Sequence, residues 1–429
     1  SVTQTSASDG MNSELSQIND GGGASNSATV TQSGMGAGVG SNTGSVLIQN
    51  GTGESAIVLQ DVDTVDALSM INQSGIDGGV TVEQVLGTGV TSMVTQSGVG
   101  QSAYVRQAGD GGYSELTQSN EANTAFLVQT GADNRSFATQ DGTTNGFNIQ
   151  QTGTGSTSNV TQSGPNGRIE VLQFLGSGST STITQTGQSV GAGVRQSGTN
   201  QQSTITQSAV IGSLSATGAG ARLSQSGEGN ISTIDQSGAQ SPLYVSNFGL
   251  GDPVSGNMGS VGSVRVDQFG IGNQSTVNQP GNSAIGIVDQ VGDRNRSFMD
   301  QGGEANLARL EQRGDDNFSK WDQTSTFANS SGNIVRQTGD RNSSTIVQSG
   351  TGIDDFLSDT NEVGLRQVGN DNFQTVMQAG VENGSLTVQT GNANNSAITQ
   401  DGTSNRIFVD QIGDANRSSV TQNMGSATN

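Results

Sequence analysis

The fold is decided by residues 92–118, SMVTQSGVGQSAYVRQAGDGGYSELTQ, in which Gln96, Gln107 and Gln118 stand eleven residues apart. The same spacing recurs along most of the chain. A fixed period of this kind indicates a repeat architecture in which each repeat packs on its neighbours. The glutamines that keep this spacing in the regular blocks are Gln96, Gln107, Gln118, Gln129, Gln140, Gln151, Gln162, Gln173, Gln268, Gln279, Gln290, Gln301, Gln312, Gln323, Gln367, Gln378, Gln389, Gln400, Gln411 and Gln422.

Counting back from each glutamine defines the rest of the unit, for example NTAFLVQ at 123–129. The residue two before the glutamine is usually aliphatic, the one four before it is small, and the one six before it is often Asn. Alternate residues of a strand lie on one face, so this pattern predicts a strand with all four positions facing inward. Polar and Gly residues such as 131–133 then predict a tight turn. Trp321 falls in the aliphatic position and is expected to fill the interior.

The residue before the glutamine indicates that the true repeat is 22 residues. Thr occupies this position in alternate units only, and mixed residues occupy it in the units between. The alternate threonines are Thr95, Thr117, Thr139, Thr161, Thr184 and Thr206. One strand type therefore stacks on itself every second unit. This predicts an all-β, two-sheet β-solenoid, or cross-β stack, with Gln96 and Gln118 in one ladder and Gln107 in the other.

The regularity of the repeat varies along the chain. Residues 1–95 hold less regular repeat units, and residues 96–429 hold a regular block, which together predict one continuous solenoid. Counting degenerate units as strands gives 38 units, or about 19 coils of 22 residues. The degenerate units lie near 208–224, 237–262, 324–336 and 349–366, where Ala216-Thr217-Gly218, Asn247-Phe248-Gly249, Asn257-Met258-Gly259 and Asp359 replace the ladder glutamine.

Composition limits what such a chain can do. Only 30% of its residues are hydrophobic and its net charge is −21, which is typical of disorder, but the repeat argues for order. The chain has no Cys and no His, so disulfides, thiolate nucleophiles, imidazole bases and the usual zinc ligands are excluded. We therefore predict that it is not an enzyme and that it uses no cofactor.

Charge and hydropathy bear on partners and location. With 16 basic and 37 acidic residues, the chain lacks the basic surface that nucleic-acid binding needs. Apolar runs such as 56–59 are too short to cross a bilayer, so we expect no membrane insertion. The chain begins at Ser1 without a leader, which we interpret as a mature exported form whose signal peptide has been removed.

The repeat resembles the curlin repeat of curli, the bacterial amyloid fibre. The fullest copies are QSGEGN at 225–230 and QFGIGN at 268–273. The resemblance implies a strand–turn–strand coil, export to the extracellular space, and polymerisation into biofilm-matrix fibres that mediate adhesion and aggregation. It also implies a nucleator subunit and a dedicated outer-membrane secretion pore as partners. The alternative is a monomeric β-solenoid surface adhesin.

Physical reasoning points to self-assembly. Burying a Val or Ile contributes about 1.5–3 kcal/mol, while ordering one residue costs about 1–2 kcal/mol, so a single coil is unstable. Stacking adds backbone pairing and Gln and Asn ladders along the axis. A stack without caps has two open ends, and head-to-tail contact between copies makes a filament. We therefore expect the main partner to be the chain itself.

Acidic residues before the ladder glutamine form one further feature. Asp267, Asp289 and Glu311 recur every 22 residues and should stack on one sheet, while Asp300 and Asp322 should stack on the other. Like charges one rung apart repel. We expect a solvated acidic face, and the arginines expected to neutralise it in part are Arg294, Arg296, Arg309 and Arg313. Weak Ca²⁺ bridging by the first three acids is the alternative.

Overall fold

A computed structural model describes residues 2–4, 11–18, 24–32, 43–61, 64–208, 220–237, 263–281, 284–303, 306–324, 334–350, 362–381 and 383–424. These residues form strands and turns and no helix, which confirms the all-β prediction. The chain divides into two compact units, Ser1–Gln202 and Ser203–Asn429. In each unit the chain alternates between two sheets, here called sheet A and sheet B.

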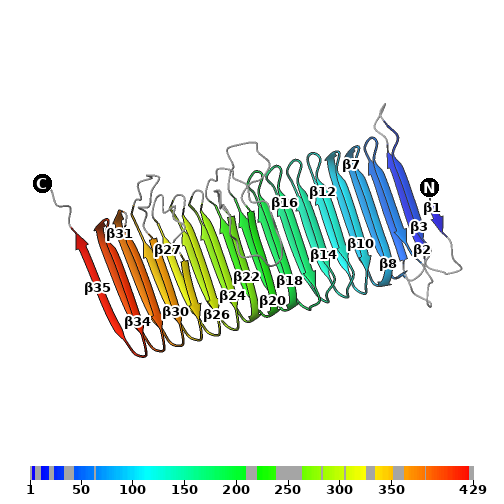
Figure 1. The fold of residues 1–429 in the computed structure, drawn as a ribbon. Helices are drawn as coiled ribbons and strands as arrows, with labels where there is room; N and C mark the ends of the chain where they lie inside the picture. The colour runs from blue at the N-terminus through cyan, green and yellow to red at the C-terminus, as the bar shows by residue number, and fades with distance from the viewer. Residues whose placement is uncertain are drawn as a thin grey trace, which may run out of the picture. The chain divides into compact units, whose positions relative to one another are not determined.

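The strands of the first unit follow this alternation (Figure 1). Sheet A contains β1 (Val2–Gln4), β3 (Ser27–Gln32), β5 (Ser55–Gln60), β8 (Gly79–Thr88), β10 (Ser102–Ala108), β12 (Thr124–Gln129), β14 (Gly146–Gln151), β16 (Arg168–Phe174) and β18 (Gly191–Thr199). Sheet B contains β2 (Met11–Ile18), β4 (Thr43–Asn50), β7 (Leu68–Ile76), β9 (Thr91–Val99), β11 (Tyr113–Gln118), β13 (Arg135–Gln140), β15 (Thr157–Gln162) and β17 (Thr180–Gln185). The two-residue β6 (Thr64–Val65) pairs with the end of β8.

The second unit repeats the arrangement. Sheet A contains β20 (Gly220–Glu228), β22 (Ser263–Ile271), β24 (Ile285–Val291), β26 (Leu307–Arg313), β28 (Ile334–Thr338), β30 (Glu362–Val368), β32 (Gly384–Thr390) and β34 (Arg406–Ile412). Sheet B contains β19 (Gln202–Gln207), β21 (Ile231–Gln236), β23 (Gln274–Gln279), β25 (Arg296–Gln301), β27 (Phe318–Gln323), β29 (Ser343–Gln348), β31 (Phe373–Val381), β33 (Asn395–Thr403) and β35 (Arg417–Met424). Strand β19 begins at the last residue of the first unit.

Pairing is parallel and in register from coil to coil. In sheet A, β10 pairs with β12 from Ser102 opposite Thr124 to Gln107 opposite Gln129. In sheet B, β9 pairs with both β7 and β11, and Thr95 lies opposite Asn72 on one side and Thr117 on the other. Each step along a sheet therefore moves one coil, which is 22 residues long where the repeat is regular, as between β10 and β12. The two-sheet β-solenoid is confirmed.

The interior of each unit is thin and largely polar. Burial alternates along every regular strand, with the small residue, the aliphatic residue and the glutamine inside, as in β12. Trp321 is buried between Met299 and Ile346 of the neighbouring strands, so it fills the interior as expected. Its indole Nε1 donates to the Gln348 Oε1 at 3.3 Å.

The predicted number of coils is wrong. The described residues hold 35 strands, including the short β6, and not 38 units. β20 pairs directly with β22, and β21 directly with β23, so no further rung of either sheet lies between them. β29 likewise pairs directly with β31, so no further rung of sheet B lies between those two strands. The degenerate units counted at Ala216, Asn247, Asn257 and Asp359 themselves lie outside the described residues.

Candidate functional site: side-chain ladders and the terminal strand

The ladder glutamines make continuous hydrogen-bond chains inside each unit. In sheet A, Gln107 Nε2 donates to Gln129 Oε1 at 3.0 Å, and in sheet B, Gln96 Nε2 donates to Gln118 Oε1 at 2.8 Å. The links continue across longer connections, from Gln225 to Gln268 over 43 residues. From Gln96 to Gln411, the structure places every glutamine of the predicted ladders at an exposed fraction of 6% or less. Gln422 alone among them is partly exposed.

Each amide also joins the two sheets. Gln107 Nε2 donates to the carbonyl oxygen of Thr91 in sheet B at 2.8 Å, and Gln129 repeats this with Tyr113 at 3.1 Å. Buried amides cost free energy unless they are hydrogen-bonded, so this double use explains why Gln and no shorter residue occupies the position. In all these ladder links the donor belongs to the lower-numbered coil. The ladders therefore have a direction along the axis.

Asparagine forms a second ladder along the axis, as expected, and its amide contacts backbone groups of the next coil. Asn295 Oδ1 accepts the backbone N–H of Asn317 in the next coil at 3.0 Å, and Asn295 Nδ2 donates to the Gly314 carbonyl at 2.7 Å. Asn317 repeats both bonds toward the following coil. One side chain thus satisfies two backbone groups of the neighbouring turn. The recurrence of Asn six residues before Gln was the signal for this role.

Glycine is required where turns stack on one another. Gly292 and Gly314 follow ladder glutamines by two residues and have φ of 114° and 112°, a region that side chains disfavour. A Cβ added to Gly314 would overlap the carbonyl oxygen of Gly339 in the next coil, and one on Gly292 would overlap that of Gly314. The Gln-x-Gly spacing therefore reports a backbone contact between coils.

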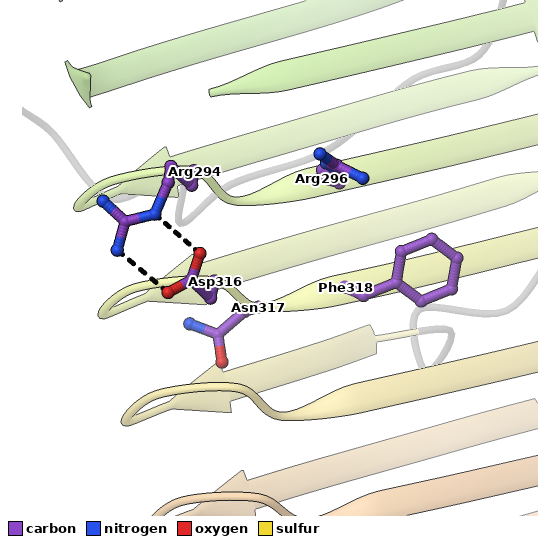
Figure 2. Close-up of a pocket in the computed structure, with 5 residues that line it drawn as sticks. All are labelled: Arg294, Arg296, Asp316, Asn317 and Phe318. Carbon is purple, nitrogen blue, oxygen red and sulfur yellow. Dashed lines mark hydrogen bonds and ion pairs between the residues drawn. The ribbon is translucent and has the colours of Figure 1, made fainter. Parts of the chain in front are cut away.

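The turn that follows carries ion pairs between coils. Arg294 and Asp316 occupy the same left-handed position of successive turns, with φ of 55° and 59°. The Arg294 Nε and Nη2 donate to the two carboxylate oxygens of Asp316 at 2.8 and 2.9 Å, beside a depression that Arg296, Asn317 and Phe318 also line (Figure 2). This pairing holds the pKa of Asp316 below its ordinary value. Sequence reasoning did not find this contact, because its partners lie 22 residues apart.

The acidic column on sheet A differs from the expected solvated face. Asp267, Asp289 and Glu311 do lie opposite one another in register. However, Asp267 and Glu311 are 8% and 3% exposed, so they are buried on the outer side of the sheet. Glu311 lies between the Arg309 Nη2 at 2.6 Å and the Arg336 Nε at 2.7 Å.

The expected arginine partners are partly different ones. Arg309 pairs with the column as expected, but Arg265 and Arg336 supply its other direct ion pairs. Arg294 instead binds Asp316 on the turn, and Arg296 borders that same depression. Arg313 takes part through its charge, which helps to lower the pKa of Glu311 and partly opposes the raised pKa of Asp289.

Asp289 is the member of this column whose ionised form is disfavoured by its surroundings. Burial raises its pKa, and the neighbouring carboxylate of Asp267 raises it further. On sheet B, burial and then Asp322 raise the pKa of Asp300, which lies opposite Asp322 in register. Among the residues that the structure describes, no three acidic side chains gather in a way that could hold a metal ion. The column is thus compensated by arginine, and the structure offers no support for cation bridging by Asp267, Asp289 and Glu311.

Asp289→Asn is expected to stabilise the second unit at pH 7. The folded-state pKa of Asp289 is raised, so its stabilising contribution is complete only below the ordinary carboxyl range near about pH 4 and is lost as the pH rises. The urea midpoint of Asp289→Asn should therefore exceed that of the wild type at pH 7, and the difference should vanish toward pH 4. Glu311→Gln is the matched control, because it removes the negative charge and one of the two acceptor oxygens that bind Arg309 and Arg336, and it should lower the midpoint at pH 7. Equal midpoints for wild type and Asp289→Asn at pH 7 would contradict this assignment.

The last described strand, β35, has an open outer edge among the described residues. It pairs with β33 on one side only. Its inward Ser418, Val420 and Gln422 are partly exposed, whereas Ile398 at the equivalent position of β33 is 1% exposed. The inward side chains of β35 therefore follow the same pattern as those of the interior strands. In the interior strands these side chains are buried by the coil that follows.

No protein-family model matches the sequence, and the curated proteins include none similar enough to count as a match. The curlin resemblance therefore stays an interpretation of the repeat. Within the described ranges, no helix has the length and apolar character needed to cross a membrane.

Proposed function

We propose that this chain is a structural, non-catalytic subunit that stacks head to tail into extracellular, curlin-type fibres of a bacterial biofilm matrix. The observation that carries the proposal is the combination of directional ladders with the open edge of β35. A β-solenoid of this kind is compatible with a repetitive structural protein or an adhesin, and the open edge favours the former.

Ladder polarity supports one mode of contact. Gln389 Nε2 donates to Gln411 Oε1, so the next link needs an acceptor on a further coil. Asn416 accepts nothing from a following Asn among the described residues, although Asn394 accepts its backbone N–H at 3.0 Å. A second copy that arrives with its first coils in the same orientation would offer both groups. A copy that arrives in the opposite orientation would bring donor against donor.

In the proposed fibre, the strands lie perpendicular to the long axis. Coils repeat at the usual strand spacing of about 4.8 Å, so aligned fibres should give a strong reflection at that spacing along the axis. Partners implied by the curlin resemblance, a nucleator and an outer-membrane secretion pore, belong to the same proposal. They would act before and during growth, and not in the finished stack.

Seeded growth of the 429-residue chain tests the proposal. Monomer should convert to fibres after a lag, and sonicated fibre fragments should abolish the lag, because an existing edge removes the unfavourable first stacking step. Thioflavin fluorescence and electron microscopy over time provide the measurement. A chain that stays monomeric at high concentration for days would overturn the fibre assignment and favour a monomeric surface adhesin.

A further inference from the structure

The outer face of sheet B in the first unit carries a single-file column of threonines. Strands β9, β11, β13, β15 and β17 pair in register, so the residue before each ladder glutamine is Thr on five successive rungs. These residues are Thr95, Thr117, Thr139, Thr161 and Thr184. All five lie at least partly exposed on the outer side of the sheet.

A second column, of four hydroxyl residues and one carboxylate, runs beside the first. The residue after each ladder glutamine is also at least partly exposed, and the column consists of Ser97, Ser119, Asp141, Ser163 and Thr186, in which the Ser119 Oγ donates to the Asp141 Oδ1. The backbone continues to pair there, since Ser119 N donates to the Gln140 carbonyl at 2.8 Å and Ser163 N to that of Gln185 at 2.9 Å. The two columns therefore form a regular hydroxyl strip along the unit.

This face carries little charge. Of the outward positions on β9, β11, β13, β15 and β17 and in the column that follows the glutamines, only Glu115, Arg135 and Asp141 are charged, in a chain whose net charge is −21. The equivalent column on sheet A is mixed, with Arg106, Val128, Gln150, Leu172 and Arg195. Two copies can thus approach through sheet B of the first unit with little repulsion.

We infer that this strip is a lateral contact for a second copy of the chain, joined through the same face. A hydroxyl group both donates and accepts, so identical columns are complementary to each other. Threonine is stiff at χ1, which keeps the entropic cost of docking low. Identical side chains repeated along a cross-β axis interdigitate in dry interfaces between sheets.

The inference deepens the proposed function and rests on it. Head-to-tail stacking would build one filament, and the strip would pair two filaments side by side. A shift by one coil would still leave four of the five threonines opposite one another, so the contact tolerates a small offset between filaments. The pairing is isologous, with the same patch on both copies.

The test compares two triple variants of the full chain. Thr117→Glu, Thr139→Glu and Thr161→Glu place like charges on the strip. Val128→Glu, Gln150→Glu and Leu172→Glu, at the same strand position on sheet A, form the matched control. Both should elongate from seeds at near wild-type rates. The sheet B variant should give single filaments and about tenfold less fibre in a low-speed pellet, because like charges brought together in an interface are strongly unfavourable.

Further outcomes separate the possibilities. Added salt should restore part of the bundling of the sheet B variant, since exposed charges are screened, and Thr→Ser at the same three positions should leave bundling unchanged. Equal bundling by both triple variants, or single filaments from the wild type, would overturn the inference. A third outcome would assign the strip to a glycan instead. In that case the wild type forms single filaments that bind cellulose, and only the sheet B variant loses this binding.

If the wild type forms no fibres, the proposed function is wrong, but the lateral contact can still be tested. Sedimentation of the soluble chain would then show whether two copies associate through the strip. A dimer that only the sheet B variant loses supports the contact, and a wild type that remains monomeric overturns it.

Discussion

Gly314→Ala is expected to destabilise the second unit by about 3 kcal/mol, because the new side chain must occupy a strained backbone region. Gly314 has φ of 112°, and its Cβ would overlap the carbonyl oxygen of Gly339. Neither the strained backbone angle nor the overlap with Gly339 can relax easily, because the turns of the coils before and after repeat the same contact. Denaturation followed by circular dichroism would measure the loss.

Gly384→Ala is the control for this prediction. A Cβ at Gly384 would meet only the Arg406 Cγ at an ordinary 3.9 Å. Its unfolding midpoint should stay close to that of the wild type. Equal destabilisation by the two substitutions would show that glycine content, and not the stacked turn, sets stability.

Blocking the open edge should have the largest effect on growth. Val420→Asp together with Ile398→Asp should slow self-elongation by more than about tenfold, because stacking would bury unpaired carboxylates. Val420 is only partly buried in the monomer, so Val420→Asp alone should fold and still block the edge. Fragments of wild-type fibre should take up little of either variant, and a small fraction of variant should cap wild-type growth.

The matched control places the same charge on the other side of the same strands. Thr399→Asp and Thr421→Asp lie at exposed outward positions next to the inward ones. They leave the stacking surface unchanged, so elongation should stay within about twofold of wild type, since exposed charges one rung apart interact weakly. Equal slowing by both sets would mean that charge as such, and not the edge of β35, limits growth.

Much of the fold could be predicted from the sequence because its signals are local. A period of two decides which side chains face inward, and this needs no knowledge of the partner strand. The change of the residue before Gln between successive units also revealed two sheets. Predictions from these signals, such as the interior position of Trp321, were confirmed.

The coil count failed for a non-local reason. Degenerate units resemble strands in sequence. However, a segment forms a rung of the solenoid only if it pairs with the strands of the coils before and after it. β21 pairs with β23 across 43 residues, because the Gln236 amide reaches Gln279 at 3.0 Å and the backbone ladder is already complete. Loop closure costs little more for a long connection than for a short one, so strands that are far apart in the sequence can still pair directly.

By itself, the sequence determined the repeat, the inward positions and the absence of His and Cys chemistry. Only the tertiary structure decided which arginines compensate the acidic column and which groups the recurring Asn and Gly contact in the turns. Each of these contacts joins residues a coil or more apart, such as Arg336 with Glu311. Such contacts depend on how coils stack, and the spacing of residues within one unit carries no information about the side-chain geometry between two.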